Sequence, residues 1–182
     1  MFGFPAGWEA WTVRSRKRVG RCLLSVLLWV WTGTLYFFME VIWKTVSGRP
    51  ESISWTMLLL AIFLAVPLER CGAELPWEMP LAVQSALCGA AITAMEFVAG
   101  LIINVWLGMD VWDYSHMPGN LMGQVCPQFW VMWAGLAALG IVMLDWMRYA
   151  VEGGERPHYV LWKVHPQGRP ALRSPRRAGR GR

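Results

Sequence analysis

The chain has 182 residues, of which 55% are hydrophobic and 13 are tryptophan, and its formal net charge is +5. A water-soluble domain of this length does not carry so many apolar side chains, so the composition excludes an ordinary soluble protein and favours one that uses the bilayer as its solvent. The positive charge lies mainly at the two ends of the chain, where it bears on orientation in a membrane before it bears on nucleic acid.

The N-terminal segment 1–21 is a basic arm that stands directly ahead of an apolar run. A secretory signal begins in the same way, but this run extends over about 22 residues, no small-x-small cleavage site follows it, and more apolar segments come later. We therefore predict a retained first transmembrane helix over 22–43. At a rise of about 1.5 Å per residue it is long enough to cross a hydrocarbon core of roughly 30 Å.

The second apolar segment, 53–68, is short for a transmembrane helix. Pro67 near its end, followed by Glu69 and Arg70, indicates an interface anchor and a stop. Its brevity also fits an interfacial helix, but an odd number of spans would place one basic terminus outside the cell. The charge distribution therefore favours a segment that crosses.

Two longer apolar segments complete the predicted fold. The segment 81–107 is long enough to cross with a tilt, and 127–147 begins with a proline that suits a first helical turn. The sequence thus predicts an all-α fold, a polytopic membrane bundle with four transmembrane helices. This domain occupies 22–148, and 149–182 forms a basic, Gly- and Pro-rich tail that is expected to be largely disordered.

Orientation follows from the distribution of Lys and Arg. With four spans, all of the 17 Lys and Arg residues except Lys44 and Arg49 lie on the same side as the two termini. The positive-inside rule then places both termini in the cytoplasm and the loop 108–126 outside. We expect a multi-pass protein of the cell membrane, surrounded by lipid, whose basic tails bind anionic lipid and not nucleic acid.

Two of the predicted spans carry a carboxylate on a face of small and polar residues. Glu96 shares one helical face with Gly89, Thr93, Gly100 and Asn104, and Glu40 ends a comparable stripe. Such a stripe normally faces other helices, and an ionisable group in a membrane faces the bundle interior, a partner or water. One hypothesis is a polar cavity that binds a substrate, a cation or a proton, lined by Glu40, Glu96, Asn104 and Asp113. The other is that hydrogen bonds or an ion pair, such as Glu40 with Lys44, only fix helix packing.

The loop WDYSHMPGN, residues 112–120, combines a carboxylate, an imidazole and two aromatic rings. Asp113 and Ser115 suit backbone bonds in a turn, and the Pro-Gly-Asn sequence supplies turn geometry, so a structural loop explains most of it. A binding loop remains the alternative. Asp113 and His116 alone fall short of the three or four ligands that a metal site needs, so no metal is expected.

Several chemical signatures are missing from the sequence. The four cysteines form no CxxC pair, and no phosphate-binding GxxxxGK[ST] loop, GxSxG elbow or HExxH helix is present. His158 and His165 lie in the polar tail and are expected to be surface residues. The sequence therefore predicts no enzyme activity, no catalytic residue and no cofactor.

Four runs carry a family resemblance: LYFFMEVIW at 35–43, LPWEMPL at 75–81, the stretch 96–126, and ERPHY at 155–159. They resemble the small bacterial four-span membrane proteins known as putative ABC-transporter type IV permeases, and the resemblance covers about residues 30 to 160. The residues that match the family pattern are Glu96, Gly100, Trp112, Asp113, Tyr114, Ser115, Pro118, Asn120, Gly123 and Cys126.

The resemblance implies a transport role in the bacterial plasma membrane, with no catalytic residues to carry across. Because the chain lacks an ATP-binding motif and has only four predicted helices, a permease of this kind would require a separate ATPase subunit and assembly as an oligomer. The competing interpretation is a non-transporting structural or accessory membrane protein that acts through helix–helix interaction.

Overall fold

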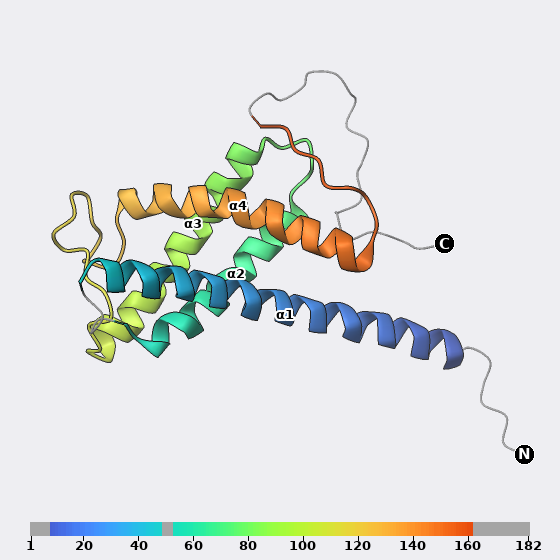
Figure 1. Ribbon diagram of the computed structural model, residues 1–182, viewed down its shortest axis with the longest axis horizontal. Helices are drawn as coiled ribbons and strands as arrows, with labels where there is room; N and C mark the ends of the chain where they lie inside the picture. The colour runs from blue at the N-terminus through green and yellow to red at the C-terminus, as the bar shows by residue number, and fades with distance from the viewer. Residues whose placement is uncertain (1–7, 49–52, 162–182) are drawn as a thin grey trace, which may run out of the picture.

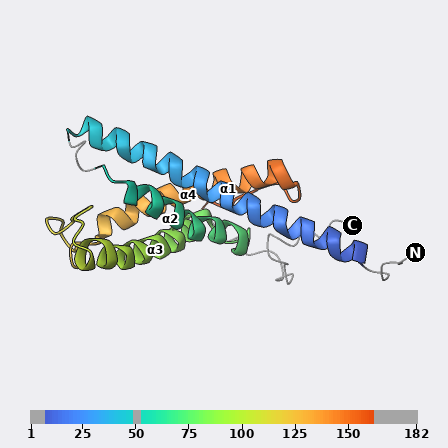
Figure 2. The same ribbon diagram turned by 90° about the horizontal axis from the view of Figure 1, so that it is seen from below.

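A computed structural model describes residues 8–48 and 53–161, and within them it contains helices and no strand. The elements in chain order are α1 (Trp8–Val46), α2 (Trp55–Glu74), α3 (Leu81–Gly100), the π-helix η2 (Leu101–Trp106) that continues α3, and α4 (Pro127–Glu152). In Figure 1, α1 and α4 run across α2 and α3. The N-terminal part of α1 extends beyond the other helices (Figures 1 and 2).

Four helical segments among the described residues are long and apolar enough to cross a membrane. They are Gly20–Val46, Trp55–Glu74, Leu81–Trp106 and Pro127–Glu152. This result confirms the prediction of an all-α membrane protein with four transmembrane helices.

The second helix is longer than the sequence indicated. The stop predicted at residue 68 rested on Pro67 and on the charged pair that follows, yet α2 continues to Glu74. A proline within a membrane helix is tolerated when neighbouring helices pack around the kinked turn. The helix can continue past Glu69 because this charged side chain is buried and ion-paired inside the bundle.

The two ends of the chain extend beyond the described residues. The helix α1 begins at Trp8, so it includes most of the segment that the sequence analysis treated as a basic arm. The sequence analysis began the disordered tail at Tyr149, whereas the structure describes α4 to Glu152 and a packed segment to Leu161. The disorder expected for residues 162–182 lies outside the described residues.

Close backbone contacts join the helices into two pairs. A Cβ atom added to Gly33 of α1 would lie 2.5 Å from the backbone nitrogen of Ile62 in α2. A Cβ atom added to Gly89 of α3 would lie 2.8 Å from the backbone nitrogen of Ala134 in α4. Small residues allow such approach in membranes, and the prediction that the small-residue faces contact other helices is confirmed at both sites.

The interior between the two pairs is filled by apolar side chains. Leu68 of α2 packs against Gly140 of α4, where an added Cβ atom would meet the Leu68 side chain at 2.5 Å. The buried residues of the central cluster come from all four helices, and they include Leu28, Leu64, Cys88, Ile92, Ala137 and Ile141.

The segment after α4 folds back against the loop between α2 and α3. The backbone N–H of Leu81 donates to the Val160 carbonyl at 2.7 Å, and the Tyr159 hydroxyl donates to Asp145 Oδ2 at 3.0 Å. His158 is exposed at the surface, as expected, and its ring stacks on Trp77 with centroids 4.9 Å apart. These contacts close one end of the bundle.

The contact at Gly33 generates a stability prediction. Gly33→Ala should lower the thermal midpoint of the detergent-solubilised protein, because the new methyl group would overlap the backbone and the Cγ1 atom of Ile62, and overpacking costs about 1–3 kcal/mol. The matched control is Gly135→Ala, since nothing lies within 4 Å of that Cβ position. Equal midpoints for the two variants would contradict the close α1–α2 contact.

Candidate functional site

A buried carboxylate on α3 organises one polar cluster. Glu96 is 3% exposed, and it accepts a hydrogen bond from Trp133 Nε1 of α4 at 2.8 Å and one from the Tyr114 hydroxyl at 3.3 Å. No Lys or Arg in the described part of the chain forms an ion pair with Glu96. The carboxyl group is therefore held by neutral donors from α4 and from the loop that follows η2.

Aromatic rings enclose this carboxyl group. The Tyr36 ring of α1 packs against Trp133 with centroids 5.1 Å apart, and the Tyr114 ring stacks on Phe129 at 4.3 Å. Burial, together with the nearby Glu96 charge, raises the pKa of Tyr114 above its ordinary value. Its hydroxyl therefore stays protonated and acts as a donor to Glu96.

Glu40 of α1 lies at the edge of the same cluster. Its side chain is 10% exposed, and Oε1 pairs with Lys44 Nζ at 2.8 Å, one helical turn away. The second oxygen, Oε2, is buried and has no hydrogen-bond partner. Tyr36 lies one helical turn before Glu40 on α1, and its ring packs against Trp133, the donor to Glu96. Through these two rings Glu40 of α1 belongs to the same cluster as Glu96 of α3.

Asn104, the third residue of the predicted site, connects η2 to the loop that follows it. Its Nδ2 donates to the Trp112 carbonyl at 3.0 Å and to Gln124 Oε1 at 2.9 Å, and its Oδ1 accepts from the Val111 N–H at 2.8 Å. All of these partners belong to the loop. Gln124 is a buried member of this network that the sequence analysis did not select, because a single glutamine in a loop has no pattern that indicates burial.

Asp113, the fourth residue of the predicted site, is exposed and lies in a turn. Its Oδ1 accepts from the Ser115 N–H at 2.8 Å and from the Ser115 hydroxyl at 2.6 Å. These bonds to the charged form lower the pKa of Asp113 below its ordinary value. No contact brings this carboxylate to Glu96, so the turn accounts for its position.

The other family-pattern residues of the loop also form its framework. Asn120 Nδ2 donates to the carbonyls of Ser115 and Met117, and its Oδ1 accepts from the Gly123 N–H at 2.9 Å. Gly123 has a φ of +68°, and an added Cβ atom would meet Ser115 Oγ at 2.5 Å. The remaining contacts join Trp112 Nε1 to the Gln124 carbonyl and Gln128 Nε2 to the Pro118 carbonyl, while Cys126 is buried.

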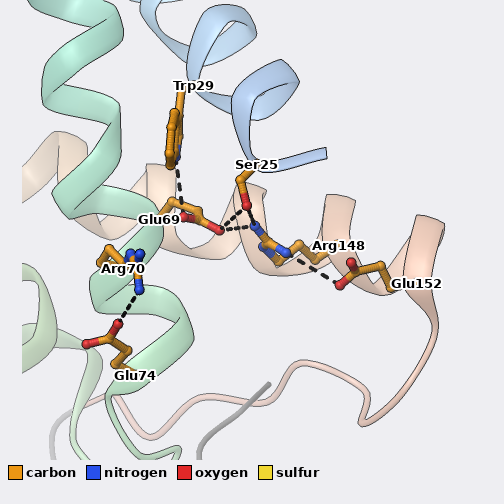
Figure 3. Close-up of polar contacts among 7 residues, drawn as sticks. All are labelled: Ser25, Trp29, Glu69, Arg70, Glu74, Arg148 and Glu152. Atoms are coloured by element: carbon orange, nitrogen blue, oxygen red, sulfur yellow. Dashed lines mark hydrogen bonds and ion pairs between the residues drawn. The ribbon is translucent and has the colours of Figure 1, made fainter. Parts of the chain in front are cut away.

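A second buried polar cluster joins α1, α2 and α4 (Figure 3). Glu69 of α2 is 2% exposed and forms an ion pair with Arg148 of α4. From α1, Ser25 Oγ donates to Glu69 Oε1 and Trp29 Nε1 donates to Glu69 Oε2, each at 3.3 Å. Arg148 also donates to Ser25 Oγ at 2.9 Å, and its other terminal nitrogen lies 3.4 Å from Glu152 Oε2.

Sequence analysis placed Glu69 just beyond the end of the second predicted span and did not select Arg148, so it missed this cluster. The adjacent pair Arg70 and Glu74 does behave as an interface pair, with both side chains more than half exposed. A signal was present, since Glu69 continues the buried α2 face at a spacing of four residues from Ala65, which itself follows Ala61 by four. The sequence did not show that Arg148, which lies on a different helix, is the partner of Glu69.

The two clusters lie at opposite ends of the bundle. Trp133, beside Glu96, and Arg148, beside Glu69, are separated by about 22 Å along α4 at a rise of about 1.5 Å per residue. The apolar core lies between them. A separate, mostly apolar pocket of about 310 Å³ opens beside the loop, and it is lined by Thr93, Gly119, Leu121, Val125, Cys126, Pro127 and Trp130. The described residues contain no group of three or more potential metal ligands.

Four apolar helices that enclose buried, paired charges define a polytopic membrane protein. A family model described as putative ABC-transporter type IV matches residues 37–160, and the chain belongs to this family. Neither the curated proteins nor the solved structures provided a match.

The donors to Glu96 generate a second prediction. Trp133→Phe should lower the free energy of unfolding by about 1–3 kcal/mol, because a buried carboxyl oxygen loses its N–H donor. Thermal unfolding in detergent measures the effect. Trp130→Phe is the matched control, since Trp130 lies on the same helix and is 38% exposed. If both substitutions had the same small effect, the Trp133 bond would contribute nothing.

Proposed function

We propose that the chain is the membrane-embedded permease subunit of an ABC-type transporter of the bacterial plasma membrane. The observation that carries the proposal is the family match, which covers most of the four-helix bundle and both buried clusters except for Ser25, Trp29 and Tyr36. The sequence contains no phosphate-binding loop, so a separate subunit would bind and hydrolyse ATP. With four helices per chain, we expect the permease to assemble as an oligomer.

The charge distribution supports an orientation with both termini in the cytoplasm. Nearly all Lys and Arg residues lie on the side of the termini when the four spans are traced. In this orientation Glu96 and the loop after η2 lie toward the outside, and Glu69 with Arg148 lies toward the cytoplasm. The basic terminal segments would then lie beside anionic lipid.

We further propose that Glu40 and Glu96 form the ion-binding or substrate-binding part of the permease. Glu96 is buried, Glu40 belongs to the same cluster with a side chain that is 10% exposed, only Glu40 of the two is ion-paired to a cation, and the Oε2 atom of Glu40 has no hydrogen-bond partner. A proton or a cation at this position would balance the remaining negative charge. In this proposal Asn104 and Asp113 hold the loop through their hydrogen bonds, while Glu40 and Glu96 bind the ion or substrate.

A non-transporting accessory role is the second candidate. It is favoured by the complete hydrogen bonding of Glu96, both of whose oxygens already have donors. In that case the carboxyl group would fix helix packing and nothing else. The two roles differ in what they require at position 96: transport requires an ionisable group, and packing requires only acceptors.

A pair of substitutions at Glu96 separates the two roles. If the site exchanges a proton or cation, Glu96→Gln should leave assembly and thermal stability close to those of the parent but reduce the ATPase activity of the captured transporter complex at least tenfold. Glu96→Ala should lower both activity and stability, because two buried donors lose their acceptors. Full activity of Glu96→Gln would remove the ion-binding role and leave the packing role.

Crosslinking in native membranes tests the transport assignment itself. We expect mass spectrometry of the captured proteins to identify an ATPase with a phosphate-binding loop, and we expect the complex to hydrolyse ATP. The control omits the crosslinker and uses a chain that lacks the tail beyond Leu161. It measures how much protein is captured through non-specific binding by the basic residues. A chain that purifies as a monomer and captures no ATPase would contradict the proposal.

A further inference from the structure

We propose that the cluster of Ser25, Trp29, Glu69 and Arg148 is the cytoplasmic gate of the permease. This inference rests on the proposed transport function and orientation. The gate closes the bundle between the Glu40–Glu96 site and the cytoplasm, and it opens when the two helix pairs separate at that end.

Burial makes this cluster unusual as a purely structural contact. The Glu69 side chain is 1% exposed and that of Arg148 is 13% exposed, so both charges have lost most of their contact with solvent. The desolvation cost of a buried ion pair often exceeds its attraction, and well-packed apolar residues are commonly as stable in the same place. The stability of the fold alone therefore does not explain why charged residues occupy this position. A contact that has to break and re-form during transport does explain it.

The connections of the cluster coincide with the division of the bundle into two pairs. Gly33 holds α1 against α2, and Gly89 holds α3 against α4, through close backbone contacts, and in the proposed mechanism each pair moves as a unit. Glu69 accepts from Ser25 and Trp29 within its own pair, and it binds Arg148 of the other pair. Any rocking of one pair against the other at this end must break the bond between Glu69 and Arg148.

The opposite end of the bundle is joined in a different way. There the pairs meet through the ring contact between Tyr36 of α1 and Trp133 of α4, beside the two carboxyl groups of the proposed site. A ring contact has no obligatory partner, so it separates at less cost than a buried ion pair that leaves uncompensated charges. The structure therefore corresponds to a state closed toward the cytoplasm, and alternating access requires the Glu69–Arg148 contact to open.

Cys88 provides a native reporter for opening at this end. It is fully buried in the apolar core of α3, and Cys71, two residues beyond Glu69, packs against the same core. The experiment uses the full-length chain with Cys22, Cys71 and Cys126 replaced by serine. A membrane-impermeant maleimide is added either to inside-out vesicles or to spheroplasts, and Cys88 labelling is followed by mass shift.

We expect slow labelling of the parent from both sides. Glu69→Gln and Arg148→Gln should increase the labelling rate at least tenfold from the cytoplasmic side only, and Arg148→Lys, which keeps the charge with fewer donors, should give an intermediate rate. Glu74→Gln is the matched control, since it breaks the exposed pair with Arg70 on the same helix and should not change labelling.

Two results would overturn the gate. Labelling that is unchanged in Glu69→Gln would show that the contact does not control access, and labelling that increases equally from both sides would show that the pair only stabilises the fold. If Arg148→Gln fails to fold, Glu69→Gln and Arg148→Lys still decide between these results. The labelling requires no ATPase, so its outcome is independent of the capture experiment that tests the transport assignment.

Discussion

The structure depends on the need of every charge inside an apolar helix bundle to find a partner inside the protein. A charged side chain in a membrane costs several kcal/mol unless it faces the bundle interior and is paired or hydrogen-bonded. Glu69 meets this condition with Arg148, and Glu96 meets it with Trp133 and Tyr114. These contacts constrain how the helices rotate about their axes, since each carboxyl group has to point at its donors on a neighbouring helix.

The glycine contacts complement this constraint. Gly33 and Gly89 allow two pairs of helices to approach at backbone distance, where dispersion contacts replace a hydrophobic driving force that lipid does not supply. The buried charged residues then connect the two helix pairs that the glycines allow to form. The result is a bundle with close backbone contacts within each pair and an apolar core between the pairs, and the ion pair between Glu69 and Arg148 crosses from one pair to the other at the end where the gate is proposed.

In the loop after η2, most residues of the family pattern have a structural role. Asp113, Asn120 and Gly123 satisfy backbone groups of the loop or permit its left-handed turn, and Asn104 of η2, which is outside the family pattern, also bonds to the loop backbone. Only Tyr114 reaches from this loop to the buried Glu96 carboxyl. The loop therefore holds one donor over the proposed site, and its other polar residues named here form hydrogen bonds within the loop.

The sequence by itself determined the number of helices, the membrane as solvent and the faces that pack, because hydropathy and small-residue spacing are local properties of each segment. It did not determine the extent of α2, since Pro67 and Glu69 resemble a stop until the buried partner of Glu69 is known. That partner, Arg148, is 79 residues away, and only the tertiary structure decides which of two distant charges share one buried position.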